Sequence, residues 1–224
     1  MNAISRAAAV VAALVLAAPA SASSAFFPVR LADDIVLQLP GDWTIVEGNP
    51  RNQPQASVES RAAPDGEVDA ESQPRFSADD YDDAGRVAAR VEVRYHPWQS
   101  ASQDDAAGAT EFELGRVDRA MHAAVEKSFG ELGIALLEWK GTVKRDVNGT
   151  AAFLTEYRRS PYLDNGNFVV RILRVLDGPR SFSVTVSYRE QDGAGLGPVC
   201  ERILSSLRRG APGQPRSAPM PLAR

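Results

Sequence analysis

The stretch from residue 139 to residue 188, WKGTVKRDVNGTAAFLTEYRRSPYLDNGNFVVRILRVLDGPRSFSVTVSY, decides the fold of this 224-residue chain. Four segments rich in apolar residues follow one another there, at 139–145, 151–158, 168–176 and 182–188. Asn148-Gly149 separates the first two segments and tolerates the positive φ of a type I′ hairpin turn. Asp177-Gly178-Pro179 separates the last two. Because short turns join antiparallel neighbours, the stretch predicts an antiparallel meander.

The third segment, 168–176, predicts what surrounds this sheet. It is apolar on both faces except for Arg171 and Arg174, which favours layers on both sides of the sheet. Two amphipathic helices can supply the layers. The first spans 110–132, and the last carries one apolar stripe, formed by Leu196, Val199, Cys200, Ile203, Leu204 and Leu207. The expected fold class is α+β, an antiparallel β-sheet with helices packed on it.

The ends of the first helix are marked in the sequence. Thr110 and Glu113 have the spacing of a capping box, in which the hydroxyl and the carboxylate satisfy free backbone amides. Gly133 stands where a left-handed residue ends a helix.

Alternating apolar residues predict further strands on the N-terminal side of the helix, at 35–39, 43–46 and 87–95, the last of them half-buried. Between them, residues 48–86 are polar and rich in proline and predict a flexible insertion. Its acidic run, 79–83, lacks the spacing of a calcium loop and predicts a solvated charge run. Residues 97–109 predict a polar loop and 208–224 a disordered tail. We expect one domain over 23–207.

Residues 1–22 have the pattern of a secretory signal peptide. Arg6 precedes an apolar run over 7–18, and Ala20-Ser21-Ala22 is a small-x-small cleavage site. The run is shorter than the roughly 20 residues of a membrane-spanning helix. The composition is typical of a bacterium, so we expect cleavage after Ala22 and a periplasmic protein without a membrane anchor. Secretion is the alternative.

The net charge and the cysteine content argue against one class of partner and exclude one kind of cross-link. A formal charge of −4 gives no electrostatic case for binding nucleic acid. The single cysteine, Cys200, excludes a disulfide within the chain, and its place on an apolar stripe predicts a small buried side chain.

The sequence contains no recognisable catalytic or metal motif. His96 and His122 lack metal-ligand spacing, and no G-x-S-x-G elbow occurs. Residues 192–197 resemble a phosphate-binding turn but have the spacing G-x-G-x-G, so a plain flexible connection is expected. We therefore predict no catalytic residue, no cofactor and no metal.

Candidate partner-binding residues are aromatic and basic side chains near strand ends: His96, Trp98, Arg158, Arg159 and Tyr162. Such side chains are the usual anchors of protein interfaces. Ordinary peripheral packing is the alternative. The Ser/Thr face of segment 182–188 would admit a ligand, a closely packed helix or solvent.

Several motifs together resemble the PsbP/DcrB-like superfamily, which includes the Mog-type Ran-interacting proteins. They are Leu39-Pro40-Gly41-Asp42-Trp43, the helix 110–132, Val147-Asn148-Gly149 with Ala152, and the strand 182–188 that leads into Ile203-Leu204-Ser205-Ser206-Leu207. The resemblance implies an α/β/α sandwich and an accessory or interaction role without catalysis. The 48–86 insertion departs from a compact member.

These observations favour a non-enzymatic periplasmic protein that binds another envelope or secreted protein. One alternative is an immunity or inhibitor protein against a secreted toxin. The other is a small-molecule binder or hydrolase with a site built from dispersed residues.

Overall fold

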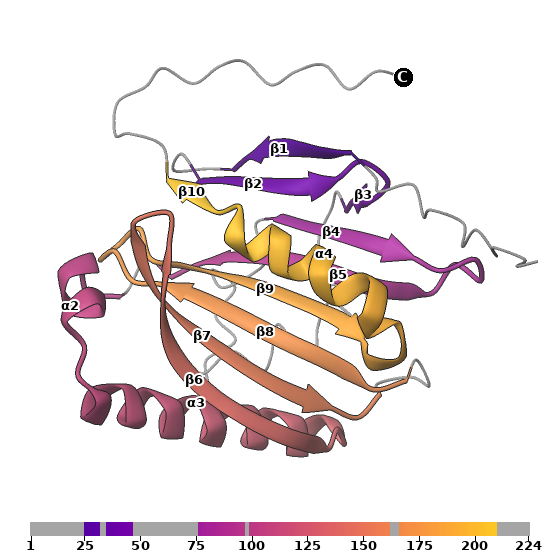
Figure 1. Cartoon of the computed structure of the whole chain (residues 1–224). Helices are drawn as coiled ribbons and strands as arrows, with labels where there is room; N and C mark the ends of the chain where they lie inside the picture. Colours follow the sequence, from indigo (N-terminus) through magenta and orange to yellow (C-terminus); the bar gives the residue numbers. More distant parts are fainter. Residues whose placement is uncertain (1–24, 32–34, 47–75, 97–98, 162–165, 210–224) are drawn as a thin grey trace, which may run out of the picture.

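A seven-stranded antiparallel sheet is the centre of the molecule, with the order β3-β4-β5-β9-β8-β7-β6 (Figure 1). The computed structural model describes residues 25–31, 35–46, 76–96, 99–161 and 166–209. The strands are β3 (Thr44–Ile45), β4 (Phe76–Tyr81), β5 (Val87–Tyr95), β6 (Leu136–Val147), β7 (Thr150–Arg159), β8 (Phe168–Val175) and β9 (Phe182–Arg189). The predicted meander is confirmed, since β6 to β9 are neighbours in chain order.

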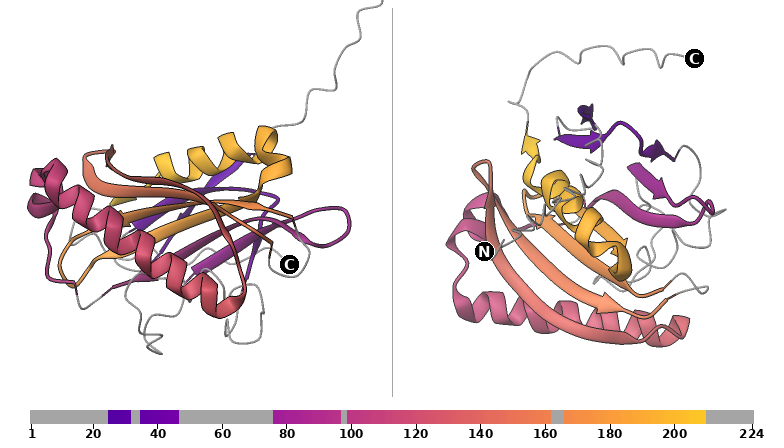
Figure 2. Two further views of the ribbon diagram at one scale, coloured as in Figure 1. Left: turned by 90° about the horizontal axis from the view of Figure 1, so that it is seen from below. Right: turned by 45° about the vertical axis from the view of Figure 1, so that its right-hand side comes forward.

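Further elements cover both faces of this sheet (Figure 2). A small sheet of order β1-β2-β10 lies beyond α4 on one face, and α3 crosses the other. A short helix, α2, precedes α3, and the 3₁₀ turn η4 leads into α4. The bounds are β1 (Phe26–Arg30), β2 (Ile35–Pro40), β10 (Arg208–Arg209), α2 (Gln103–Gly108), α3 (Glu111–Leu132), η4 (Glu190–Asp192) and α4 (Gly193–Ser205). The predicted α+β class is confirmed.

Two hydrophobic cores occupy the two faces, and β8 contributes to both. Val169 and Leu173 belong to the larger core, which joins the two sheets and α4. Val170, on the opposite side of the same strand, belongs to the smaller core beneath α3 with Phe129 and Tyr157. The expectation of layers on both sides, drawn from the apolar character of this strand, is therefore correct.

Local sequence signals fix α3 and the β6–β7 hairpin. The Thr110–Glu113 capping box is present, and Gly133 ends the helix at a φ of 69°. Asn148 has a φ of 53° in the hairpin turn. Its side-chain amide donates to the carbonyl of Leu207 at 2.7 Å, and so ties the hairpin tip to the segment after α4.

Four predictions along the chain need correction. Part of the predicted 48–86 insertion forms β4, whose edges pair with β3 and β5. Part of the predicted loop 97–109 forms α2, which the Ser102 capping box starts. Residues 208–209 of the predicted tail pair with β2, and most of 192–197 is the first turn of α4. Each of these segments gains order from contacts with distant parts of the chain. The predicted signal peptide lies outside the described residues.

Burial of the charged residues also differs from expectation. All nine residues of β5 are buried, although a half-buried strand was predicted. Asp79, from the acidic run predicted to be solvated, is fully buried. No helix in the described part of the chain is both long and apolar enough to cross a membrane.

Candidate functional site

The predicted partner-binding residues do not form one exposed patch. His96 and Arg159 are only 2% and 4% exposed. Arg159 places its guanidinium 4.6 Å from the ring centre of Phe168. Arg158 is partly exposed, whereas Trp98 and Tyr162 lie outside the described residues. Peripheral packing, the alternative considered for these side chains, therefore describes His96 and Arg159 better than an interface does.

The same residues also lie at opposite ends of the sheet. His96 follows Tyr95, which faces Phe182 at the start of β9. Arg159 faces Phe168, which faces Arg189 at the end of β9. Phe182 and Arg189 are seven residue steps apart along β9, a distance of about 24 Å. His96 and Arg159 therefore do not lie next to one another on the sheet.

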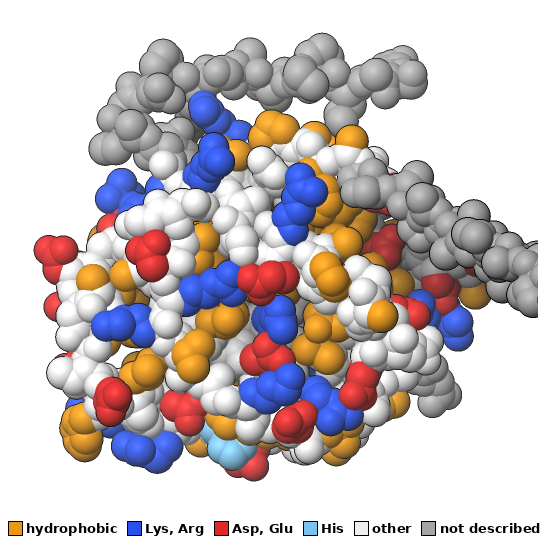
Figure 3. Space-filling view, viewed as in Figure 1, with side chains coloured by type: hydrophobic (Ala, Val, Ile, Leu, Met, Phe, Trp, Pro, Cys, Tyr) orange, Lys and Arg blue, Asp and Glu red, His pale blue; other side chains and the backbone are white. Residues whose placement is uncertain are grey.

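A row of alternating charges crosses the α4-side face of the sheet. We call it the charged strip and define it as Lys140, Glu156, Arg171, Glu201 and Arg145. Lys140 and Arg171 both contact Glu156, and the Arg171–Glu156 distance is 2.8 Å. Arg171 then reaches Glu201 on α4 at 3.1 Å, and Glu201 also pairs with Arg145. Figure 3 shows basic and acidic side chains alternating across the middle of this face.

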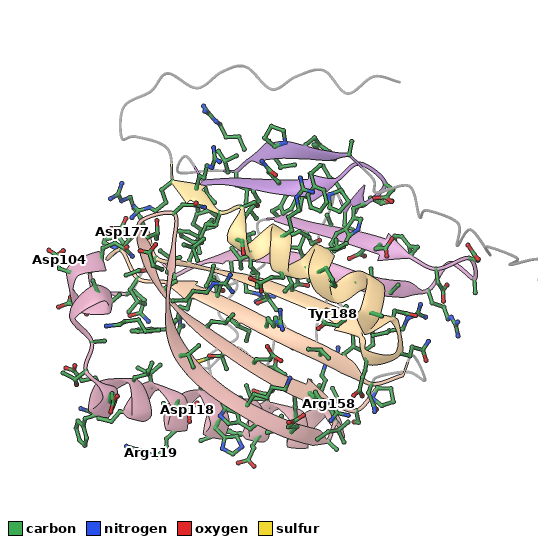
Figure 4. The ribbon with its side chains drawn as sticks, in the orientation of Figure 1. Asp104, Asp118, Arg119, Arg158, Asp177 and Tyr188 are labelled. Carbon is green, nitrogen blue, oxygen red and sulfur yellow. The ribbon has the colours of Figure 1, made fainter. Side chains whose placement is uncertain are left out.

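Arg158 extends the row of charges beyond the strip (Figure 4). Its guanidinium bonds Glu138 at 3.1 Å and Glu190 at 2.6 Å. The hydrogen bonds from Arg158 and Asn167 lower the pKa of Glu190. The charged strip and this extension together carry equal numbers of positive and negative side chains.

Within the charged strip, ion pairs and hydrogen bonds shift the pKa values of Lys140 and Glu201 toward their charged forms. The hydrogen bond to Glu156 raises the pKa of Lys140. Partial burial alone would raise the pKa of Glu201, but hydrogen bonds from Arg145 and Ser205 and the charge of Arg171 lower it overall. Beside the strip, Val143 exposes 52% of its surface. Protein interfaces combine an apolar centre with a polar rim, and Val143 with the neighbouring ion pairs has these two components.

The opposite face of β4, β5 and β9 carries a second polar group of residues, of which sequence reasoning singled out His96 and the Ser/Thr face of β9 but not the buried charged side chains. We call it the buried polar face; its members, each less than 9% exposed, are Asp79, Arg90, Glu92, Arg94, His96, Ser183, Thr185 and Ser187. The alternation of residue types along β5 predicts that Arg90, Glu92 and Arg94 share one face of the strand. Their burial depends on other parts of the chain, so the sequence of the strand does not predict it. The alternating Ser and Thr residues of β9 are the sequence signal for the uncharged part of the buried polar face.

Ion pairs and hydrogen bonds connect the buried polar face. Arg90 binds both carboxylate oxygens of Asp79, at 2.6 and 2.7 Å. Arg94 contacts Glu92 at 3.3 Å. His96 Nε2 lies 3.0 Å from Ser183 Oγ. That distance is within the range of a nucleophile and its base, but Ser183 lies inside a paired strand rather than on an exposed turn.

Burial also determines the protonation state of Cys200, the other candidate nucleophile. Cys200 lies on the buried side of α4, in the larger core. Burial raises the pKa of its thiol to about 12, so the thiolate form needed for reaction is suppressed. Within the described ranges, no group of three or more His, Cys, Asp or Glu side chains is arranged to hold a metal ion.

Comparisons with known proteins identify the fold. No family model matches the sequence, and no curated protein matches it. The solution structure of cyanobacterial PsbP from Synechocystis sp. PCC 6803 is 12% identical, with 88% of this chain and 99% of that chain covered and a TM-score of 0.53.

Two further structures are less similar. A Bacteroides thetaiotaomicron protein is 9% identical over 86% of this chain and 50% of its own, with a TM-score of 0.44. LpqN, involved in cell envelope biogenesis of Mycobacterium tuberculosis, is 12% identical over 82% of this chain and 89% of its own, with a TM-score of 0.34. The fold assignment rests on the first comparison alone. This chain has a PsbP-like fold.

Proposed function

We propose that this protein is a non-enzymatic accessory protein that binds another protein of the periplasm or cell envelope. The observation that carries the proposal is the charged strip with Val143 beside it. Its ion pairs are partly exposed, with 22% of the Arg171 side chain accessible. Internal pairing lowers the cost of covering such charges, and Val143 supplies apolar area to bury.

Two further considerations support this proposal. The sequence pattern of residues 1–22 favours export, which would bring the protein into contact with envelope and secreted proteins. The PsbP-like fold agrees with the resemblance noted in the sequence, which implies an accessory role.

Site-specific photocrosslinking in cells tests the surface. A photoreactive amino acid at Val143 should give one reproducible adduct with an envelope or secreted protein. The same probe at Phe112, which is 73% exposed on α3, is the control because it lies on the other side of the sheet. The same adducts from both positions, or none from Val143, would contradict the proposal.

The identified partner then allows a quantitative test with purified proteins. Arg158→Glu and Lys140→Glu should weaken binding by at least tenfold, because each places a negative charge beside Glu138 or Glu156. Trp98→Ala and Tyr162→Ala form a second arm, which measures whether these predicted anchors contribute. Unchanged affinity in the two charge-reversal variants would exclude the strip as the interface.

A further inference from the structure

The tip of the β6–β7 hairpin contains a dipeptide with chemical reactivity of its own. Asparagine followed by glycine, as in Asn148-Gly149, deamidates without an enzyme. The backbone nitrogen of the glycine attacks Cγ of the asparagine, and the new C–N bond closes a succinimide ring as the side-chain nitrogen leaves as ammonia. Water then opens the ring to aspartate or isoaspartate. The reaction therefore needs a side chain that can move and a backbone nitrogen that can lose its proton.

The folded structure fixes the side chain of Asn148. Its Nδ2 donates to the carbonyl of Ser205 at 2.9 Å and to the carbonyl of Leu207 at 2.7 Å, so both donors of the amide are used (Figure 1). Ser205 ends α4, and Leu207 precedes β10 with its side chain buried in the larger core. Movement of the Asn148 side chain onto the glycine nitrogen would break these two hydrogen bonds.

The backbone nitrogen of Gly149 is restrained as well. It donates to Asp146 Oδ1 at 3.0 Å. Attack requires this nitrogen to lose its proton, and the neighbouring carboxylate opposes the negative charge that would form there. Asn148 and Gly149 have φ values of 53° and 80°, the backbone of a type I′ turn, which the paired strands β6 and β7 maintain.

We propose that Asn148-Gly149 is a modification site that is protected while the hairpin tip is docked on the segment 205–207. Deamidation proceeds from the state in which the tip has opened, so its rate reports on the free energy of that local opening. The proposal does not depend on the partner surface proposed above.

Deamidation prevents the tip from docking as before. A carboxylate at position 148 cannot donate to the carbonyls of Ser205 and Leu207, and it adds negative charge at the C-terminal end of α4, where the helix dipole is also negative. Arg145 donates to Ser205 Oγ at 2.8 Å but is already paired with Glu201, so it offsets only part of this charge. Because ammonia is lost, the modified chain stays in the less stable form.

Peptide mass spectrometry of the full chain measures the deamidation rate. The wild-type protein is incubated at pH 8 in buffer and in urea, and isoaspartate at position 148 identifies the succinimide route. Asn165-Gly166 is the same dipeptide and gives an internal reference, since the two sites should react at similar rates in urea. In buffer, position 148 should react at least tenfold more slowly than in urea. Equal rates at position 148 with and without urea would overturn the proposal.

The variant Asn148→Asp reproduces one product of the reaction. Aspartate tolerates positive φ as asparagine does, so the change isolates the loss of the two donated hydrogen bonds, and Tm should fall by about 4 °C or more. Gln191→Glu makes the same amide-to-carboxylate change at an exposed position of η4 and should keep Tm within about 1 °C of the wild type. Equal Tm values for the two variants would contradict the docking of the tip by Asn148. Where Asn148→Asp does not fold, the rate comparison on the wild type decides the matter.

Discussion

Asp79 and Arg90 form a fully desolvated ion pair between neighbouring strands. Both oxygens of the carboxylate are bonded by the guanidinium, and Tyr81 donates a further bond to the same carboxylate at 3.1 Å. Removing one partner leaves a buried charge without compensation, which is far more costly than loss of an exposed pair. The pair therefore makes the position of β4 depend on β5.

We expect Asp79→Asn to lower the free energy of unfolding by about 3–5 kcal/mol, because Arg90 stays buried and loses the carboxylate that accepts two of its hydrogen bonds. Urea denaturation measures the difference. Arg180→Gln is the matched control, since it breaks a pair with Asp177 in which Arg180 is 55% exposed. The control should cost at most about 1 kcal/mol, and equal costs for the two variants would contradict this account.

Cys200 gives a second prediction at this scale. With a pKa of about 12, the thiol stays protonated at pH 8 and is enclosed by the larger core. Ellman's reagent should therefore react slowly with the native protein and rapidly after unfolding in urea. Fast labelling of the native protein would show that α4 opens readily or that the thiol is accessible.

The burial of a side chain could be predicted from sequence only where a local pattern determines it. The stripe that contains Cys200 identifies its core position, because helical periodicity is a local signal. Asp79 looked solvated because its partner Arg90 is 11 residues away, on another strand. His96 and Arg159 have residue types typical of interfaces, but their burial depends on chain segments that the sequence alone does not place around them.

Among the elements, α3 is determined most strongly by its own sequence. Its capping box, apolar stripe and terminal glycine agree with one another. The strands β1, β4 and β10 have no comparable local signals, and each acquires its hydrogen bonds from a partner strand. This difference explains why the helix was predicted with the correct ends and the Asn148-Gly149 turn in the correct place, whereas β1 and β4 were missed.

Alanine at Gly130, inside α3, and at Gly133, which ends the helix, should change the free energy of unfolding in opposite directions. Gly130 lies inside the helix, and an added Cβ would meet no atom within 4 Å. Gly130→Ala should therefore raise the free energy of unfolding by about 0.5–1 kcal/mol. Gly133 has a φ of 69°, so Gly133→Ala should lower it by about 1–2 kcal/mol. Urea denaturation of both variants measures the signs, and stabilisation by Gly133→Ala would contradict the capping role.

At the scale of the whole molecule, the sheet separates two different electrostatic environments. The α4 side carries the partly exposed charged strip, which joins β6, β7, β8 and α4. The α3 side carries the buried polar face and the smaller core. The strip connects elements that are far apart in sequence, so its charge state contributes to how α4 is held on the sheet.

Acid should therefore weaken the folded state through the strip and its extension. The pKa values of Glu190 and Glu201 are lowered in the folded protein. As the pH falls below the ordinary glutamate value, the unfolded chain takes up protons before the folded one does, so the free energy of unfolding decreases. The stabilisation is complete near neutral pH and is lost as the pH falls through the folded-state pKa values.

The measurement is Tm from pH 8 to pH 3 for the wild type and for the double variant Glu190→Gln/Glu201→Gln. The double variant should start with a lower Tm at pH 7 and lose less of it on acidification, because the two carboxylates no longer titrate. Glu131→Gln removes one negative charge at the exposed end of α3 and leaves the strip intact, so it should follow the wild-type curve. Parallel curves for the wild type and the double variant would mean that these two carboxylates contribute nothing to the acid sensitivity of the fold.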